Sequence, residues 1–315
     1  MIPLGKTEAL KYWKPLAATI FWGSSFIATK FALNEVNPPQ LILMRLFIAV
    51  ILLTVIAIYS KRDFSIKLKS HSWILLLAVI AVFHLMIQIY GLKFTTASNT
   101  GWIIGMAPVF IAILGFFFMK ESITIIKAAG ILVAFIGLIL LISHGDFSSI
   151  DFLKNKGDFL VLGSAFTWGV YSIINKKISV QYSPLMTIFY LFVTMAIIIS
   201  PIVIRGVFIN KLFHLSFRVW IAILFLGIFC SGFGYVLWSQ ALKEMEAAKA
   251  GAFLYFEPFV TVIAAWIFLS ENITFLMILS GIIITAGVLL VNLNTKQILR
   301  FLRKRSRKNS IPDNI

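Results

Sequence analysis

The chain has 315 residues, of which 60% are hydrophobic and only 13% charged, and its mean hydropathy is +0.97. A soluble domain carries about 25% charged residues, so this composition excludes a water-soluble globular protein. The net charge of +16 is spread over short polar segments without an aromatic-interleaved basic patch, so we expect no nucleic-acid partner. The single cysteine, Cys230, lies in an apolar segment, and no metal or cofactor is expected.

Apolar stretches of about 20 residues follow one another along the chain, separated by short polar segments. A helix needs about 20 apolar residues to cross about 30 Å of hydrocarbon. The pattern therefore predicts an all-α integral membrane protein with ten transmembrane helices. They are expected near residues 13–33, 39–59, 72–92, 97–118, 123–143, 158–175, 184–204, 217–241, 248–269 and 274–294.

The positive charges indicate the orientation of these helices. If the N-terminus is cytoplasmic, 20 Lys and Arg residues face the cytoplasm and 6 face outward. Such an excess is typical of cytoplasmic segments in the positive-inside rule. We therefore expect a multi-pass protein of the cell inner membrane with both termini in the cytoplasm. The longest external loop is expected at about residues 144–157.

The two halves of the sequence resemble each other. An offset of 146 or 150 residues pairs matching side chains over nearly the whole chain, which predicts an internal repeat. Because each half holds five helices, the second half enters the membrane from the opposite side, as in alternating-access carriers with a site at the repeat interface. The pairs include Trp22 with Trp168, Lys30 with Lys176, Gly101 with Gly251 and Pro108 with Pro258. The expected units are a first five-helix repeat at 13–143, a second at 158–294 and a basic cytoplasmic tail at 295–315.

Several sequence motifs occur in combination. WGSSF begins at Trp22, RLFIA begins at Arg45, and a long run from Gly234 to Thr274 ends in ENIT, with a weaker echo from Ala107 to ESIT. This combination resembles the EamA family of the drug/metabolite transporter superfamily. The resemblance implies a ten-helix basket whose central cavity is lined by the first, third, fourth, sixth, eighth and ninth helices. It also implies transport of amino acids, amines, carboxylates or related metabolites, often outward.

Polar and aromatic side chains recur at helical spacing within the apolar segments. Because polar groups facing lipid are costly, such stripes indicate the faces turned inward. The alternative is that Ser and Thr bond to their own helices and that Trp marks the membrane interface. The candidate cavity or substrate-binding residues are Trp22, Ser25, Thr29, His84, Gln88, Trp168, Tyr171, Asn175, Tyr235 and Trp238.

Two charged residues lie inside predicted spans. Glu257 is about 12 Å inside the ninth, where it can bind a substrate amine, carry a proton, or bond a neighbouring helix structurally. Arg45 can pair with Glu257 or attract a substrate carboxylate, but we expect it to snorkel to the outer headgroups. Pro108 and Pro258 lie mid-span, where each removes a helix hydrogen bond and can bend the helix as a gate.

Small residues and further carboxylates are expected to serve the structure. Gly101 and its repeat partner suit close helix packing, and the glycines of the fifth and tenth segments, Gly137 and Gly287 among them, have the same interpretation. Glu121 and Glu271 fall at the starts of the fifth and tenth helices, where a carboxylate complements the helix dipole.

Other classes of membrane protein are less well supported. An intramembrane enzyme needs a nucleophile with a base, or paired acids, and the sequence holds neither GxSxG nor HExxH. The absence of a GxxxxGK[ST] motif argues against an ATP-driven pump. A channel-like protein remains an alternative, although the repeat favours alternating access. We therefore expect no catalytic residue and predict a secondary transporter, an exporter or exchanger of small organic solutes, driven by a proton or a counter-substrate.

Overall fold

The computed structural model describes residues 6–64, 71–119, 124–143, 155–179, 183–203, 212, 214–245 and 250–292, and every regular element within them is helical. The hydrocarbon core of a bilayer holds no water for the backbone to bond with, and a helix satisfies its own N–H and C=O groups internally. The elements are α1 (Lys6–Ala32), α2 (Pro38–Tyr59), α3 (His71–Phe94), α4 (Ala97–Ile104), α5 (Ala107–Met119), α6 (Ile125–Ile142), α7 (Lys156–Ser179), α8 (Pro184–Val203), α10 (Phe217–Phe225), η3 (Leu226–Phe233), α11 (Gly234–Glu244), η4 (Ala252–Phe256), α13 (Glu257–Leu269) and α14 (Phe275–Asn292).

The helices are those of a multi-pass membrane protein. Within the described ranges, six helical stretches are long and apolar enough to cross a membrane, and three shorter apolar helices accompany them. Exposed side chains on the outer surface are largely apolar, including Phe118 at 74% and Trp266 at 62% exposure, as lipid contact requires. The expected loop at 144–157 falls mostly outside the described residues.

Both mid-span prolines coincide with a change in helix geometry. Pro108 is the second residue of α5, directly after the break at Gly105 and Met106 that separates α5 from α4. Pro258 is the second residue of α13, directly after the 3₁₀ segment η4. A proline has no N–H and its ring conflicts with the preceding turn, so each helix restarts where its proline can occupy the first turn.

A π-helical segment, η3, joins α10 to α11, and no motif in the sequence predicts it. Such segments shift the register of a helix by one residue, occur mostly as short insertions and are frequent at functional sites. The segment includes Cys230 and Ser231, whose contacts with other helices are described below.

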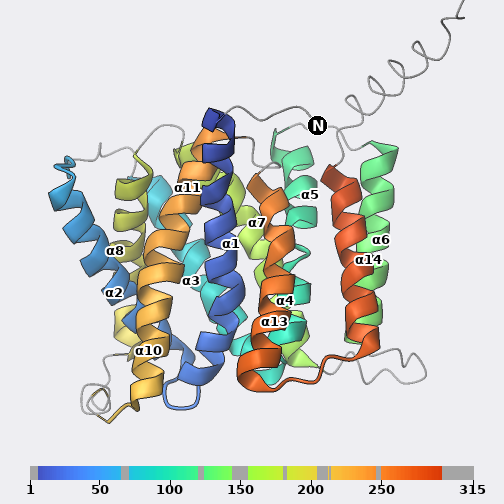
Figure 1. Cartoon of the computed structure of the whole chain (residues 1–315). Helices are drawn as coiled ribbons and strands as arrows, with labels where there is room; N and C mark the ends of the chain where they lie inside the picture. The colour runs from blue at the N-terminus through green and yellow to red at the C-terminus, as the bar shows by residue number, and fades with distance from the viewer. Residues whose placement is uncertain are drawn as a thin grey trace, which may run out of the picture.

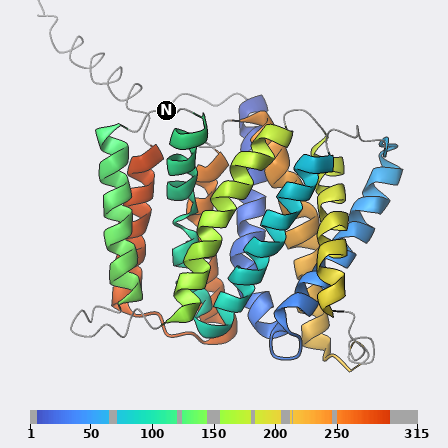
Figure 2. The same cartoon turned by 180° about the vertical axis from the view of Figure 1, so that it is seen from behind.

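Helices from the first half of the chain pack mainly against helices from the second half. α1 packs against α11 and α13, and α7 packs against α3 and α5, whereas α2 contacts α8 and α6 contacts α14. Figures 1 and 2 show α1 and α7 in the middle of the bundle, running in opposite directions, with the α6 and α14 pair at one edge. This arrangement places α1 and α7 beside most of the residues of the pocket described below.

The α6 and α14 pair illustrates the expected packing role of glycine. A Cβ at Gly287 would lie 2.3 Å from the backbone N of Ala134, and one at Gly137 would lie 2.8 Å from the backbone N of Ile284. Neither distance is compatible with a side chain, so both positions need glycine for the backbones to approach.

Candidate solute pocket

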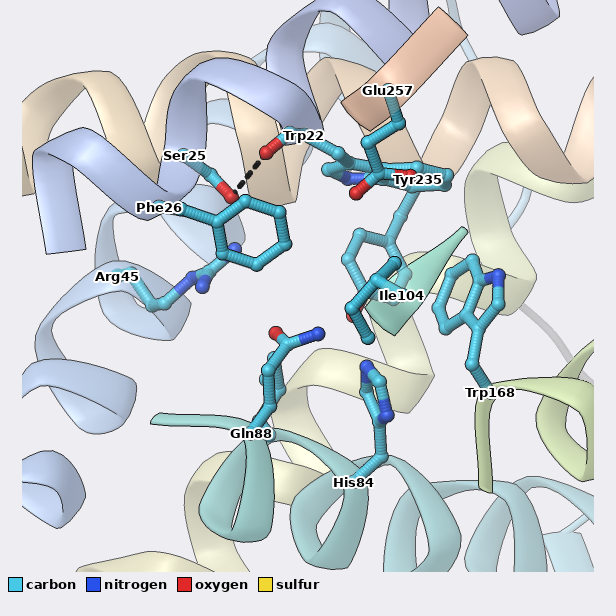
Figure 3. A pocket seen from close by; sticks show the side chains of 11 residues that line it. Trp22, Ser25, Phe26, Arg45, His84, Gln88, Ile104, Trp168, Tyr235 and Glu257 are labelled. Carbon is cyan, nitrogen blue, oxygen red and sulfur yellow. Dashed lines mark hydrogen bonds between the residues drawn. The ribbon is translucent and has the colours of Figure 1, made fainter. Parts of the chain in front are cut away.

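A pocket lies in the middle of the bundle, between α1, α2, α3, α4, α7, α11 and α13 (Figure 3). Its cavity volume of about 30 Å³ is far below the roughly 300 to 1,000 Å³ of pockets that bind small organic ligands. An organic solute can therefore enter only if the lining side chains or helices move apart. The lining residues are Trp22, Ser25, Phe26, Arg45, His84, Leu85, Gln88, Ile104, Trp168, Tyr235 and Glu257.

Aromatic rings from both halves of the chain form one wall of the pocket. The ring centroid of Trp22 lies 4.9 Å from that of Trp168 and 5.5 Å from those of Tyr235 and Trp238, in edge-to-face arrangements. Trp168 in turn stacks on Tyr171 with centroids 4.9 Å apart and an interplanar angle of 15°. These are favourable aromatic geometries, and they present a π-rich surface to any solute in the pocket.

Two of the lining residues, Trp22 and Arg45, donate hydrogen bonds to the π-helical segment η3. Trp22 Nε1 donates a hydrogen bond to the carbonyl oxygen of Cys230 at 3.0 Å. Arg45 Nε donates to Ser231 Oγ at 2.8 Å, and Arg45 is only 4% exposed. The expectation that Arg45 snorkels to the headgroups is therefore wrong, because its guanidinium turns inward and finds a partner on η3.

Glu257 reaches the same pocket from the first turn of α13, and it is 4% exposed. Among the described residues it forms no ion pair with Arg45, and its carboxylate has no hydrogen-bond partner. The backbone around it is fixed, since the Thr261 hydroxyl lies 2.9 Å from the Glu257 carbonyl oxygen and 3.0 Å from that of Gly23 on α1. Figure 3 shows Glu257 and Arg45 projecting into the pocket from different helices.

His84 and Gln88 complete the polar lining from α3. His84 Nδ1 lies 2.9 Å from the carbonyl oxygen of Ser164. Because a carbonyl only accepts, this contact places a proton on Nδ1, and Nε2 is then the acceptor whenever the ring is neutral. The ring of His84 also lies 5.3 Å from that of Trp168, which links α3 to α7 beside the pocket.

Four of the expected cavity residues do not line this pocket. Tyr171 and Trp238 stand behind the aromatic wall, and Thr29 and Asn175 are buried farther along α1 and α7. Pro108 and Pro258 likewise lie near helix breaks rather than in the lining. Conversely, the pocket is lined by three apolar residues that a pattern of polar side chains cannot predict. These are Phe26, Leu85 and Ile104.

Glu271 has a structural role, but on a different helix from the one expected. Its carboxylate accepts hydrogen bonds from the backbone N–H groups of Ala97 and Ser98 at 2.8 and 3.0 Å, and from Ser98 Oγ at 2.7 Å. It therefore caps α4, not α14, and ties the two halves of the chain together. Glu121 lies outside the described residues.

The chain is similar in sequence to a known family over nearly its whole length. The model of the EamA-like transporter family matches residues 12–143 and again residues 155–293. The chain belongs to the EamA-like transporter family, within the drug/metabolite transporter superfamily, and is a multi-pass membrane transporter.

Its relatives are similarly named. An uncharacterised transporter of Archaeoglobus fulgidus is 31% identical over 285 residues, covering 88% of this chain and 96% of the relative. The uncharacterised transporter YyaM of Bacillus subtilis is 28% identical over 295 residues, covering 90% and 95%. A crystal structure of another protein, 16% identical, covers 92% of this chain and 99% of its own with a TM-score of 0.68, which shows a shared fold.

Proposed function

We propose that the protein is a secondary transporter, an exporter or exchanger, of small organic solutes that carry ammonium or carboxylate groups, such as amino acids and amines. The observation that carries this proposal is the presence of one buried basic and one buried acidic residue in the same pocket. Arg45 and Glu257 both line it, yet they do not pair with each other among the described residues. A buried charge needs compensation, and a bound solute can provide it for both.

The groups in the pocket suit a solute with two poles. The guanidinium of Arg45 is a planar donor suited to a carboxylate. The carboxylate of Glu257 is an acceptor suited to an ammonium group. The aromatic wall around Trp22 and Trp168 offers apolar and cation–π contact to the rest of the solute.

The packing of the helices supports a ten-helix arrangement of two inverted repeats, at 13–143 and 158–294. If α1 and α7 are equivalent, the contacts of α1 with α11 and α13 have counterparts in those of α7 with α3 and α5. The opposite directions of α1 and α7 fit an inverted relation (Figure 1). The pocket lies where both halves contribute residues, as in carriers that work by alternating access.

The small cavity also favours alternating access over a permanently open pore. Solute entry requires the lining to separate, and an inverted repeat offers two equivalent ways of separating it, one toward each face. With the excess of Lys and Arg in the predicted cytoplasmic segments, we place the protein in the inner membrane with both termini inside. A proton carried by Glu257 or a counter-substrate would supply the energy.

A charge-resolved counterflow screen tests this proposal. Purified protein in liposomes is offered amino acids, amines, monocarboxylates and nucleotide derivatives, with the parent, Arg45→Gln and Glu257→Gln compared. We expect Arg45→Gln to weaken carboxylates and zwitterions, and Glu257→Gln to weaken amines and zwitterions. Equal effects of both variants on all solutes, or counterflow of none, would contradict the proposal.

A further inference from the structure

Among the residues of α7 and α11 that do not line the pocket, four with polar atoms are of particular interest. Tyr171, Asn175, Trp238 and Ser239 each have 0% exposure. The Tyr171 hydroxyl, both amide atoms of Asn175, Trp238 Nε1 and the Ser239 hydroxyl find no hydrogen-bond partner in the described part of the chain. Buried polar groups are nearly always bonded, so four neighbouring exceptions require an explanation. We call these four residues the α7–α11 seam.

The seam begins at the aromatic wall of the pocket. Tyr171 stacks on Trp168, and the ring of Trp238 lies 5.5 Å from Trp22 and 6.0 Å from Trp168. α7 and α11 pack against each other. The seam therefore extends the pocket wall between these two helices.

The seam ends at a lysine. Lys176, the residue after Asn175, donates hydrogen bonds from Nζ to the carbonyl oxygens of Leu242 at 2.9 Å and Met245 at 2.8 Å. These carbonyls belong to the end of α11, whose last carbonyl groups attract a cation. Lys176 thus joins the ends of α7 and α11 beyond the polar residues.

The repeat relates the seam to the pocket itself. At the offset of 146, Tyr171 corresponds to Ser25, and at the offset of 150, Trp238 corresponds to Gln88. Ser25 and Gln88 both line the pocket. Two of the four seam positions, those of Tyr171 and Trp238, therefore correspond to residues that form the solute site in the other half of the chain.

The lysine contact has a counterpart at the opposite end of the bundle. Lys30, which corresponds to Lys176, donates from Nζ to the carbonyl oxygen of Thr95 at 2.6 Å. Thr95 corresponds to Met245, so the two contacts are equivalent under the repeat. The Thr95 hydroxyl also donates to Asp158 at the start of α7, at 2.5 Å. α1, α3 and α7 are thereby joined at that end.

The end that carries Lys176 joins the equivalent three helices. Lys14, near the start of α1, forms an ion pair of 2.5 Å with Glu244 at the end of α11. Together with the Lys176 contacts, this pair connects the start of α1 with the ends of α11 and α7. Each end of the bundle is therefore closed by a lysine contact between repeat-related helices.

We propose that the α7–α11 seam is the closed half of the solute pathway, which opens toward the membrane face where α7 ends, and that Lys176 holds it shut. The inference rests on the proposed alternating access. When the ends of α7 and α11 separate, water and a polar solute can bond to the hydroxyl, amide and indole groups that find no partner within the described ranges. The opposite half of the pathway, beside Ser25 and Gln88, is held by Lys30.

Cysteine accessibility tests this proposal without a known solute. In a chain carrying Cys230→Ser, Ser239→Cys serves as the reporter, and a membrane-impermeant sulfonated maleimide is added to right-side-out or inverted vesicles. Because hydrogen bonds from a charged group are strong, we expect Lys176→Met to speed labelling about tenfold from the face where α7 ends. Lys177→Met, the control, alters the exposed neighbouring lysine above the Trp73 ring and should leave the rate unchanged. Lys30→Met should not speed labelling from that face.

A second variant covers the case in which Lys176→Met does not fold. Asn175→Leu keeps the lysine and replaces the unpartnered amide with an apolar side chain of similar size. If the seam is a pathway, this variant stays folded but loses labelling at Ser239→Cys. Labelling that neither variant changes, or that Lys176→Met raises equally from both faces, would overturn the proposal. Side-specific labelling without counterflow of any organic solute would keep the seam and refute only the proposed solute class.

Discussion

Glu257→Gln is the substitution that separates a solute-binding or coupling role from a structural one. Glutamine keeps the shape of the side chain and can still accept and donate hydrogen bonds, but it removes the charge. The local backbone should survive, because the contact of the Thr261 hydroxyl in this turn is to the carbonyl oxygen of residue 257 and does not involve its side chain. The carboxylate itself has no protein partner to lose among the described residues.

The size of the effect follows from the burial of the group. A hydrogen bond to a charged partner is worth about 1.5 to 3 kcal/mol. Since about 1.4 kcal/mol corresponds to a factor of ten, the apparent affinity for amines and zwitterions should fall about 10- to 150-fold. Solutes without an ammonium group should be affected much less. Counterflow at a series of solute concentrations measures the apparent affinity for solutes with and without an ammonium group.

The same variant reports on proton coupling. A carboxylic acid can exchange its proton for a solute ammonium group, whereas an amide cannot, so Glu257→Gln should flatten the dependence of transport on pH if Glu257 is the coupling group. Glu35→Gln is the control for the loss of one carboxylate charge, because Glu35 lies outside the pocket. Parental affinities and an unchanged pH profile in folded Glu257→Gln protein would refute both functional roles and leave a packing role.

Three further predictions concern the wall, the packing and the topology. Trp168→Ala should abolish most counterflow per unit of folded protein, because it removes the ring in contact with Trp22 and Tyr171; unchanged counterflow in the monodisperse fraction would argue against a role of this wall. Gly287→Val should lower stability by about 1 to 3 kcal/mol through overpacking of α6 against α14, seen as a lower thermal midpoint, whereas Gly163→Ala, with its nearest contact at 3.6 Å, should not. Reporter fusions to the C-terminal tail should give cytoplasmic signals, and an external signal would contradict the ten-helix scheme.

The positions of the helices were largely predictable from the sequence. Apolar length is set by the thickness of the bilayer, and this single physical requirement places most helices within a few residues. The two prolines also marked breaks correctly, since the missing N–H acts locally. The π-helical segment was not predictable, because its register depends on contacts that Cys230 and Ser231 make with α1 and α2.

The candidate site was predictable in its types of residue but not in its geometry. Helical stripes brought Trp22, Trp168 and Tyr235 to the pocket because the inward face of a helix repeats regularly. The same reasoning failed for Arg45, since a long side chain can turn toward headgroups or toward the interior, and only the partner on η3 decides. A stripe does not say which of its residues line the pocket. Ser25 lines it and its repeat counterpart Tyr171 does not, because the lining depends on packing between helices that are far apart in sequence.

The most direct test of the central claim compares counterflow with electrical conductance for the same purified protein. Liposomes loaded with an unlabelled amino acid mixture are diluted into a labelled one, and the protein is reconstituted in parallel into planar bilayers. An alternating-access transporter with this closed pocket should give saturable counterflow that depends on Glu257, with no macroscopic conductance. Non-saturable flux together with a steady conductance would contradict the account and identify a channel.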